Sequence, residues 1–143
     1  MQIDDTDRAL IALLQENARA PVATLARRMG LARTTVQARI DRLEATGAIT
    51  GYTLRRGAVA RPPLHATALL SVEPRSGAAV LARLKTLPQV TRVHTTSGRF
   101  DMIVELAADS TAILDDTLDR IGESRGVRSS ESLIHLSTKL DRA

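Results

Sequence analysis

The feature that most constrains this chain is a change in its hydrophobic spacing at residues 55–63, which read RRGAVARPP. The segment is basic, contains Gly and Pro, and has no periodicity, as is typical of a linker. Before it, apolar residues recur about every three to four positions, which indicates amphipathic helices. After it, apolar runs that suit strands alternate with helical patterns. We therefore predict two small domains, at residues 1–54 and 64–143, joined by a linker at 55–63.

The first domain is predicted to consist of three short helices and a strand. Apolar spacing places the helices at about 4–16, 21–29 and 33–46. A strand is expected at 49–54. Gly30 lies between the second and third helices, where a left-handed residue would end one helix and turn the chain into the next. Two helices joined by such a turn and followed by a strand are typical of a winged helix-turn-helix.

The second domain is predicted to contain four strands and two helices in the order βαββαβ. In chain order, the expected elements are a strand at 65–72, a helix at 76–86, strands at 90–97 and 100–107, a helix that begins at Asp109 or Ser110, and a strand at 127–138. This order predicts a ferredoxin-like antiparallel sheet with both helices on one face, so the whole chain is of the α+β class. Ile103 and Leu133 alternate with Met102 and Ile134, so the other face of the sheet also carries apolar residues. We expect a second copy of the chain to cover that face in a homodimer.

The basic residues are concentrated before and within the linker. Residues 17–61 contain nine Arg against two acids, whereas residues 62–143 are neutral. Such a block indicates a surface that binds a polyanion such as nucleic acid. The alternative is a solvated face in a chain that prefers Arg to Lys, 18 to 2. That preference explains the choice of Arg but not the shortage of acids.

Composition excludes several classes of protein. The chain has no Cys, which excludes disulfides, thiolate metal sites, iron–sulfur clusters and a Cys nucleophile. Tyr52 and Phe100 are its only Tyr, Phe or Trp residues, too few for the stacking platforms that bind single-stranded nucleic acid. No apolar run approaches the ~18 residues of a membrane span, and the first residues are acidic where a signal peptide is basic. We expect a cytoplasmic, nucleoid-associated protein with no membrane contact.

The third predicted helix has the residues needed to contact DNA. With Val36, Ile40 and Leu43 facing the core, its other faces carry Arg, Thr and Gln side chains. In a helix-turn-helix this helix enters the major groove, where Arg pairs with guanine, Gln with adenine, and Thr with a phosphate or a thymine methyl group. Any single Arg could also be an ordinary exposed residue. The predicted DNA-binding residues, including two on the preceding helix that suit phosphate contacts, are Arg27, Arg28, Arg33, Thr34, Thr35, Gln37, Ala38, Arg39 and Arg42. Arg55 and Arg56 also suit phosphate contacts.

Three stretches of the first half form a longer pattern. They are Ile3-Asp4-x-x-Asp7, Leu25-Ala26-Arg27-Arg28-Met29-Gly30-Leu31, and Thr35-Val36-x-x-Arg39-Ile40-x-x-Leu43-Glu44-x-x-Gly47-x-Ile49-x-Gly51-Tyr52. This pattern resembles the DNA-binding half of the Lrp/AsnC (feast/famine) transcriptional regulators. The βαββαβ order of the second half, with Gly98 three residues before Asp101, resembles their ligand-sensing domain. One departure is Ala32, where such proteins usually have a Ser that caps the recognition helix.

The resemblance implies a protein that binds a free amino acid or a similar small metabolite near its central hairpin, where two dimers meet. Asp101 would bind the ammonium group of the ligand, while backbone and hydroxyl groups would bind its carboxylate. The expected effector-binding residues are Thr95, Thr96, Ser97, Gly98 and Asp101. Asp101 could instead be a solvent-facing carboxylate or pair with Arg92 or Arg99. Neither a cofactor nor a metal is expected.

We therefore predict a sequence-specific DNA-binding transcriptional regulator rather than an enzyme. Its expected partners are double-stranded DNA, a small-molecule effector, and further copies of the chain in a homodimer and higher homo-oligomers. An architectural, nucleoid-type DNA-binding protein without a small-molecule response has the same features apart from the ligand site. A haem-pathway decarboxylase, an activity known among relatives of the family, would need catalytic groups in the second domain. His65, His94 and His135 lie on three different predicted strands without metal-ligand spacing, and no hydrolase or nucleotide-binding motif is present.

Overall fold

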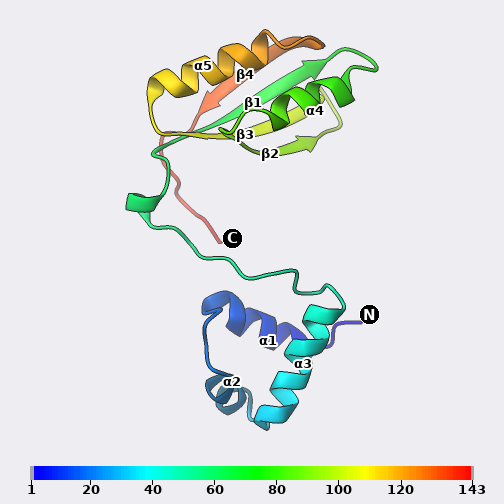
Figure 1. The fold of residues 1–143 in the computed structure, drawn as a ribbon, viewed down its shortest axis with the longest axis vertical. Helices are drawn as coiled ribbons and strands as arrows, with labels where there is room; N and C mark the ends of the chain where they lie inside the picture. The colour runs from blue at the N-terminus through cyan, green and yellow to red at the C-terminus, as the bar shows by residue number, and fades with distance from the viewer. Residues whose placement is uncertain (1, 143) are drawn as a thin grey trace. The chain divides into compact units, whose positions relative to one another are not determined.

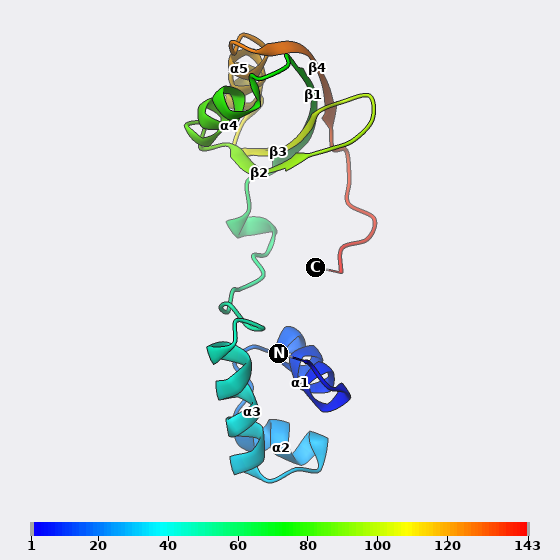
Figure 2. The ribbon, with the colours of Figure 1, turned by 90° about the vertical axis from the view of Figure 1, so that its right-hand side faces the viewer.

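The computed structural model describes residues 2–142 (Figures 1 and 2). The chain divides between Arg55 and Arg56 into two compact units, called unit 1 and unit 2. Unit 1 contains α1 (Asp5–Glu16), α2 (Val22–Met29) and α3 (Arg33–Ala45). These bounds confirm the three predicted helices to within one residue at each end. Among the described residues, no helix has the length and apolar character needed to cross a membrane.

Short-range hydrogen bonds define the ends of these helices. The Asp4 carboxylate accepts a hydrogen bond from the Asp7 backbone N–H at 2.7 Å, and the Asp7 carboxylate accepts one from the Asp4 N–H at 3.3 Å. This capping box pairs N–H groups that the start of α1 would otherwise leave unsatisfied. Gly30 ends α2 in the predicted left-handed conformation, with a φ of 67°. Ala32, at the start of α3, provides no side-chain cap.

An apolar core joins the three helices of unit 1. The predicted inward face of α3, formed by Val36, Ile40 and Leu43, is buried. It packs with buried residues of α1 and α2, namely Leu10, Leu14, Leu25 and Ala26. Because each helix buries only one stripe, its opposite face remains exposed. The core therefore holds α3 on the unit with its polar face toward solvent.

The strand predicted at residues 49–54 is wrong, because these residues form no regular element. A strand needs a second strand to pair with its backbone groups, and the described part of unit 1 contains only helices. The segment is instead tied to α3. The Ile49 N–H donates to the Leu43 carbonyl at 2.9 Å, and the Tyr52 hydroxyl donates to the Glu44 carboxylate at 2.8 Å. Unit 1 is thus a three-helix helix-turn-helix in which the expected wing is not a strand.

Unit 2 is a four-stranded antiparallel sheet with two helices. Its elements are a short 3₁₀ turn η1 (Ala58–Ala60), β1 (Leu64–Val72), α4 (Gly77–Lys85), β2 (Val90–Thr95), β3 (Met102–Ala108), α5 (Thr111–Gly122) and β4 (Val127–Ile134). The strand order β2-β3-β1-β4 and the antiparallel pairing confirm the predicted ferredoxin-like arrangement. Figures 1 and 2 show both helices on the same face of the sheet.

Three predicted strand ends in unit 2 differ from the structure by two residues or more. β4 ends at Ile134, four residues before the predicted end, because its regular pairing with β1 stops where Ile134 lies opposite Ala66, near the start of β1. Beyond this pair, the His135 N–H still donates to the His65 carbonyl at 2.9 Å, but no further residue pair is in the β1–β4 register of the described residues. The turn of the β2–β3 hairpin is also longer than predicted, since β2 ends at Thr95 and β3 begins at Met102.

The two faces of the sheet differ in their covering. On the face toward the helices, paired residues such as Ala68 with Val104 and Leu70 with Met102 are buried. The opposite face also carries apolar residues, as predicted, and one of them, Leu133, is 52% exposed. Single exposed apolar residues are common on protein surfaces, whereas a contiguous apolar patch is typical of a surface that another chain covers.

Gly126, in the turn between α5 and β4, lies where the chain passes very close to the start of α4. Its φ is 98°, and a Cβ atom at this position would lie 2.7 Å from the Ser76 Cβ and 3.1 Å from the Val80 Cγ2. A side chain here would be strained by both the backbone conformation and the contact. This turn therefore requires Gly.

We expect Gly126→Ala to lower the free energy of unfolding of unit 2 by about 1–3 kcal/mol, measured by urea unfolding with far-UV circular dichroism. Gly57→Ala is the matched control, because Gly57 has an ordinary φ of −72° and no atom within 4 Å of the added Cβ. It should change the same free energy by less than about 0.5 kcal/mol. Equal losses in the two variants would contradict the close approach at Gly126.

Candidate nucleic-acid interface and ligand site

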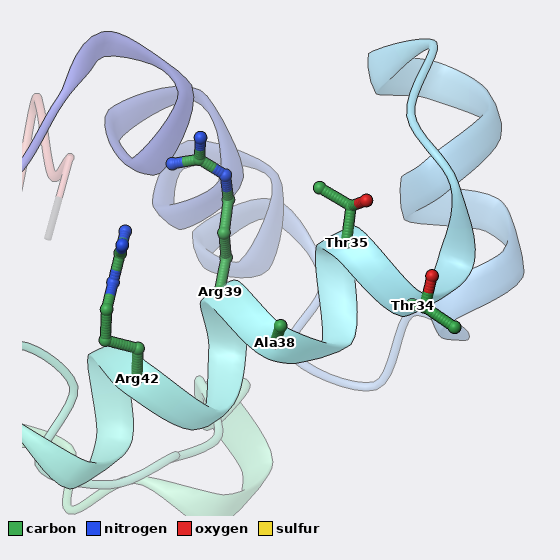
Figure 3. A pocket seen from close by; sticks show the side chains of 5 residues that line it. All are labelled: Thr34, Thr35, Ala38, Arg39 and Arg42. Atoms are coloured by element: carbon green, nitrogen blue, oxygen red, sulfur yellow. The ribbon is translucent and has the colours of Figure 1, made fainter.

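The polar face of α3 brings together five of the predicted DNA-binding residues. Thr34, Thr35, Ala38, Arg39 and Arg42 line one shallow depression along the helix (Figure 3). They occupy this face because the apolar stripe of α3 faces the core. Another predicted residue, Gln37, is exposed beside the depression, and its side-chain amide donates to Asp41 at 2.8 Å.

Arg39 is held by two carboxylates of the α1 start rather than projecting freely. Its Nη1 donates to both Asp4 carboxylate oxygens at 3.0 and 2.9 Å and to Asp7 Oδ1 at 2.9 Å. The Arg39 side chain is 25% exposed, and Asp7 is fully buried. The Asp7 N–H and the Arg39 guanidinium lower the pKa of Asp4 from 3.8 to about 2. Hydrogen bonds from Arg39 to Asp4, and then to Asp7, raise the pKa of Arg39.

Arg42 contacts the same buried carboxylate. Its Nη2 lies 3.1 and 3.0 Å from the two Asp7 oxygens, and its side chain remains 50% exposed. Asp7 therefore accepts charge-assisted hydrogen bonds from two guanidinium groups that are three residues apart on α3. We call Asp4, Asp7, Arg39 and Arg42 the α1–α3 ion cluster. Its formal charges balance, with two acids against two cations.

Ion pairs neutralise part of the positive charge of residues 17–61, called the basic block. Arg28 also pairs with an acid that precedes the block, Glu16, at 3.1 Å. By contrast, Arg27 and Arg33 are exposed and form no ion pair with any residue in the described range. Of the arginines on α2 and α3, the two without an ion pair among the described residues are thus at the end of α2 and the start of α3, and Arg42 adds a partly exposed charge. A count of charges over residues 17–61 misses the neutralising acids because they lie earlier in the chain.

The cluster acids were not predicted as functional residues. In the sequence, Asp4 and Asp7 appear only in the family pattern and at the start of the first predicted helix, and the structure confirms that they form the N-cap and first turn of α1. Their contacts with α3 join residues that are 32 to 35 positions apart. Hydrophobic spacing along the sequence gives no signal for contacts at such separations. The available signal was the pair of acids at the start of one helix and the pair of Arg residues on another helix of the same small domain, which together suggest an ion pair between the helices.

The predicted effector-binding residues lie together at the tip of the β2–β3 hairpin. The Thr96 hydroxyl donates to the Phe100 carbonyl at 2.7 Å, and the Thr96 N–H donates to the Asp101 carbonyl at 2.9 Å. Thr95 and Ser97 are exposed beside them, and Gly98 turns the chain with a φ of 114°. The structure therefore places all five predicted residues at the hairpin tip, with Thr95 at the end of β2 and the other four in the turn.

Asp101 connects this turn to β1. Its carboxylate Oδ2 accepts a hydrogen bond from the Val72 N–H at 2.7 Å, and its own N–H donates to the Leu70 carbonyl at 2.8 Å. The alternative pairing of Asp101 with Arg92 or Arg99 is wrong. Among the described residues these two arginines pair with other acids, Glu105 and Glu131, at 3.4 and 3.9 Å.

The three histidines do not form a metal site. Within residues 2–142, no group of three or more His, Asp or Glu side chains is placed to hold a metal ion. His65 and His135 do approach each other, with stacked rings whose centroids are 6.4 Å apart. The Nε2 atom of His135 lies 2.8 Å from the Thr67 hydroxyl.

Two family models match the chain. Residues 3–44 match the AsnC-type helix-turn-helix domain, and residues 65–143 match the Lrp/AsnC ligand binding domain. The chain belongs to the Lrp/AsnC family. The resemblance inferred from the sequence is confirmed, and this Lrp/AsnC protein is a transcriptional regulator with a helix-turn-helix domain and a ligand-binding domain.

Proteins similar to this chain over most of its length include transcriptional regulators of the same family. The HTH-type transcriptional regulator FL11 of Pyrococcus furiosus is 30% identical over 139 residues, which cover 94% of this chain and 89% of the relative. A solved feast or famine regulatory protein of M. tuberculosis, complexed with L-methionine, is 30% identical with a TM-score of 0.84 and covers 98% of this chain and 96% of its own. E. coli AsnC has a TM-score of 0.91 at 24% identity, with coverage of 100% and 98%, a likeness that shows the fold alone.

The lowered pKa of Asp4 makes the stability of unit 1 depend on pH. Because this pKa is lower in the folded chain than in the unfolded one, the Asp4 charge stabilises the fold above about pH 4. That stabilisation should be lost as the pH falls from 3.8 to about 2. We expect Asp4→Asn to remove this part of the acid sensitivity, seen as a smaller fall in the urea midpoint of unit 1 over that range.

The midpoint can be followed through Tyr52, since it is the only Tyr in a chain without Trp and lies in unit 1. Asp5→Asn is the matched control, because Asp5 forms only an exposed ion pair with Arg8 among the described residues. It should leave the acid sensitivity as it is in the parent protein. If Asp4→Asn behaves like Asp5→Asn, the pairing of Asp4 with Arg39 does not contribute to stability.

Proposed function

We propose that this regulator binds specific DNA sites through α3 and responds to an amino acid or a similar small metabolite through unit 2. DNA binding is supported by the exposed face of α3. There Thr34, Thr35 and Ala38 lie between Arg33, which forms no ion pair among the described residues, and the half-exposed Arg42. A recognition helix uses such a face in the major groove, with its first residues at base edges.

Different residues suit different parts of the DNA. Arg33 can pair with both acceptors of a guanine, whereas Thr34 and Thr35 can contact a thymine methyl group or a phosphate. Gln37 can bind adenine if it leaves Asp41. The remaining arginines on and after these helices, namely Arg27, Arg28, Arg55 and Arg56, suit phosphates, which orient the protein without distinguishing sequences.

A homodimer supplies the second recognition helix. The apolar residues on the uncovered sheet face of unit 2 support pairing through that face. Two recognition helices would then bind half-sites about one helical turn, or a multiple of it, apart. Higher assembly of dimers would bend promoter DNA, in the cytoplasm where that DNA lies.

The hairpin tip of unit 2 offers complementary chemistry to an amino acid. The Asp101 carboxylate uses Oδ2 on Val72 and keeps its other oxygen for an ammonium group. Hydroxyls of Thr95 and Ser97 are exposed nearby for a carboxylate. The M. tuberculosis relative bound to L-methionine supports an amino acid as the class of ligand. A ligand that binds one assembly state more tightly shifts the regulator toward that state.

The DNA-binding half is tested by the affinity of the full chain for the upstream region of its own gene and for competitor DNA at fixed salt. We expect a preference for the upstream region. Arg27→Ala should weaken binding to both duplexes to a similar extent and reduce the salt slope by about 1, as expected for one phosphate contact. Arg120→Ala, which removes a cation paired with Asp116 in unit 2, should change neither quantity. Loss of affinity for only one duplex in Arg27→Ala would contradict a phosphate contact.

The proposed response to an amino acid is tested by measuring the affinity for the upstream duplex with and without a mixture of the common amino acids. The mixture should change the affinity of the parent protein but not that of Asp101→Asn, because the ammonium group would lose its anionic partner. An Asn side chain keeps an oxygen for the Val72 N–H, so the turn should be preserved, and DNA affinity without amino acids should be unchanged. A normal response in Asp101→Asn would exclude Asp101 from the ligand site. Specific binding that no amino acid alters would favour an architectural role.

A further inference from the structure

The α1–α3 ion cluster links the recognition helix to α1 at a single buried point. Asp7 is fully buried, yet its carboxylate accepts hydrogen bonds from the Asp4 N–H, from Arg39 and from Arg42. A carboxylate is stable in such a position only when cations and donors surround it. The start of α1 is therefore bound to α3 through both guanidinium groups.

The position of these contacts on α3 suits control of its rotation. Arg39 and Arg42 lie together on one side of the buried stripe that contains Ile40 and Leu43, on the face that contacts Asp7. Apolar packing depends mainly on buried area and is not directional, whereas charge-assisted hydrogen bonds require a defined geometry. Rotation of α3 about its axis would break the bonds to Asp7 before it exposed much apolar surface. The same rotation would also change the direction in which Thr34, Thr35 and Ala38 face, and so their position relative to the major groove of bound DNA.

We propose that Asp7 is a positioning residue for DNA recognition, and that Arg39 fixes the orientation of α3 through Asp7 instead of pairing with a base. The proposal rests on the proposed function, since it concerns how α3 meets its DNA site. Direct base contacts then belong to the first turns of α3, at Arg33, Thr34 and Thr35. Arg42 has an intermediate role, because one nitrogen is bonded to Asp7 while the half-exposed side chain can still meet DNA.

The proposal and simple electrostatics predict opposite effects of one substitution. A carboxylate near bound DNA repels the phosphates, so removal of its charge should tighten binding to any sequence. If Asp7 orients α3, Asp7→Asn should instead weaken binding to the preferred site while leaving binding to mixed-sequence DNA unchanged or tighter. The decisive quantity is the ratio of the two affinities, which long-range charge effects alter little.

The experiment measures that ratio for the full chain at fixed salt, with a preferred duplex selected from a random pool. We expect Asp7→Asn and Arg39→Ala each to lower the ratio about tenfold. The loss should be spread over all base positions of the site, and the double variant should lose little more than either single one. Arg39→Lys, which keeps a cation for Asp7, should recover part of the ratio. Asp5→Asn removes the same charge from an exposed position in the same turn, and should leave the ratio within about twofold.

Folding is checked separately by circular dichroism and by the urea midpoint through Tyr52, and affinities are compared at a temperature at which every variant is folded. A variant that does not fold at any such temperature is replaced by Arg39→Gln, which removes the cation and should lower the ratio with the loss again distributed over all base positions of the site. An unchanged ratio in Asp7→Asn would overturn the proposal. So would a loss of preference at one base position alone in Arg39→Ala, because that result identifies a base contact. A parent protein that prefers no duplex from the pool would overturn the proposed sequence-specific function itself.

Discussion

Asp7 carries a negative charge in a fully buried position, and such a charge is tolerated only when hydrogen-bond donors and cations compensate for the lost water. In unit 1 these donors and cations come from two helices that are distant in the sequence. The Asp4 N–H comes from the start of α1, and the two guanidinium groups come from α3. One carboxylate thus both caps the first helix and holds the third. The apolar core brings the helices together, and these directional bonds add a defined orientation.

The same contacts change how the charge of the DNA-binding unit is distributed. Three arginines of the basic block, on α2 and α3, are paired with acids from α1. Of the five arginines on α2 and α3, Arg27 and Arg33 are the two that form no ion pair with any residue in the described range, and they lie at the end of α2 and the start of α3. Cations at this place suit the phosphates and base edges near the first residues of a recognition helix. The distribution of charge, more than its total, therefore supports the DNA-binding surface.

Unit 2 uses a comparable device with a different carboxylate. Asp101 ties the tip of the β2–β3 hairpin to the end of β1 through the Val72 N–H. The five predicted effector-binding residues lie at this hairpin tip, and the bond ties one of them directly to β1. A carboxylate that is oriented by the backbone and still has an oxygen available is well suited to bind a cationic group. The structural role of Asp101 is thus compatible with its proposed role in ligand binding.

Local patterns in the sequence determined most of the fold. Helix ends follow from hydrogen bonds over a few residues, as at Asp4 and Gly30, and the βαββαβ order follows from hydrophobic periodicity. The family was also recognisable, because its motif extends over much of the first half. Tertiary structure alone decided three points: that residues 49–54 form no strand, that β4 stops at Ile134, and that Arg39 binds Asp4 and Asp7. Each depends on a partner distant in the chain. A strand forms only where another strand pairs with it, and an arginine is free or neutralised according to which acid the fold brings near it.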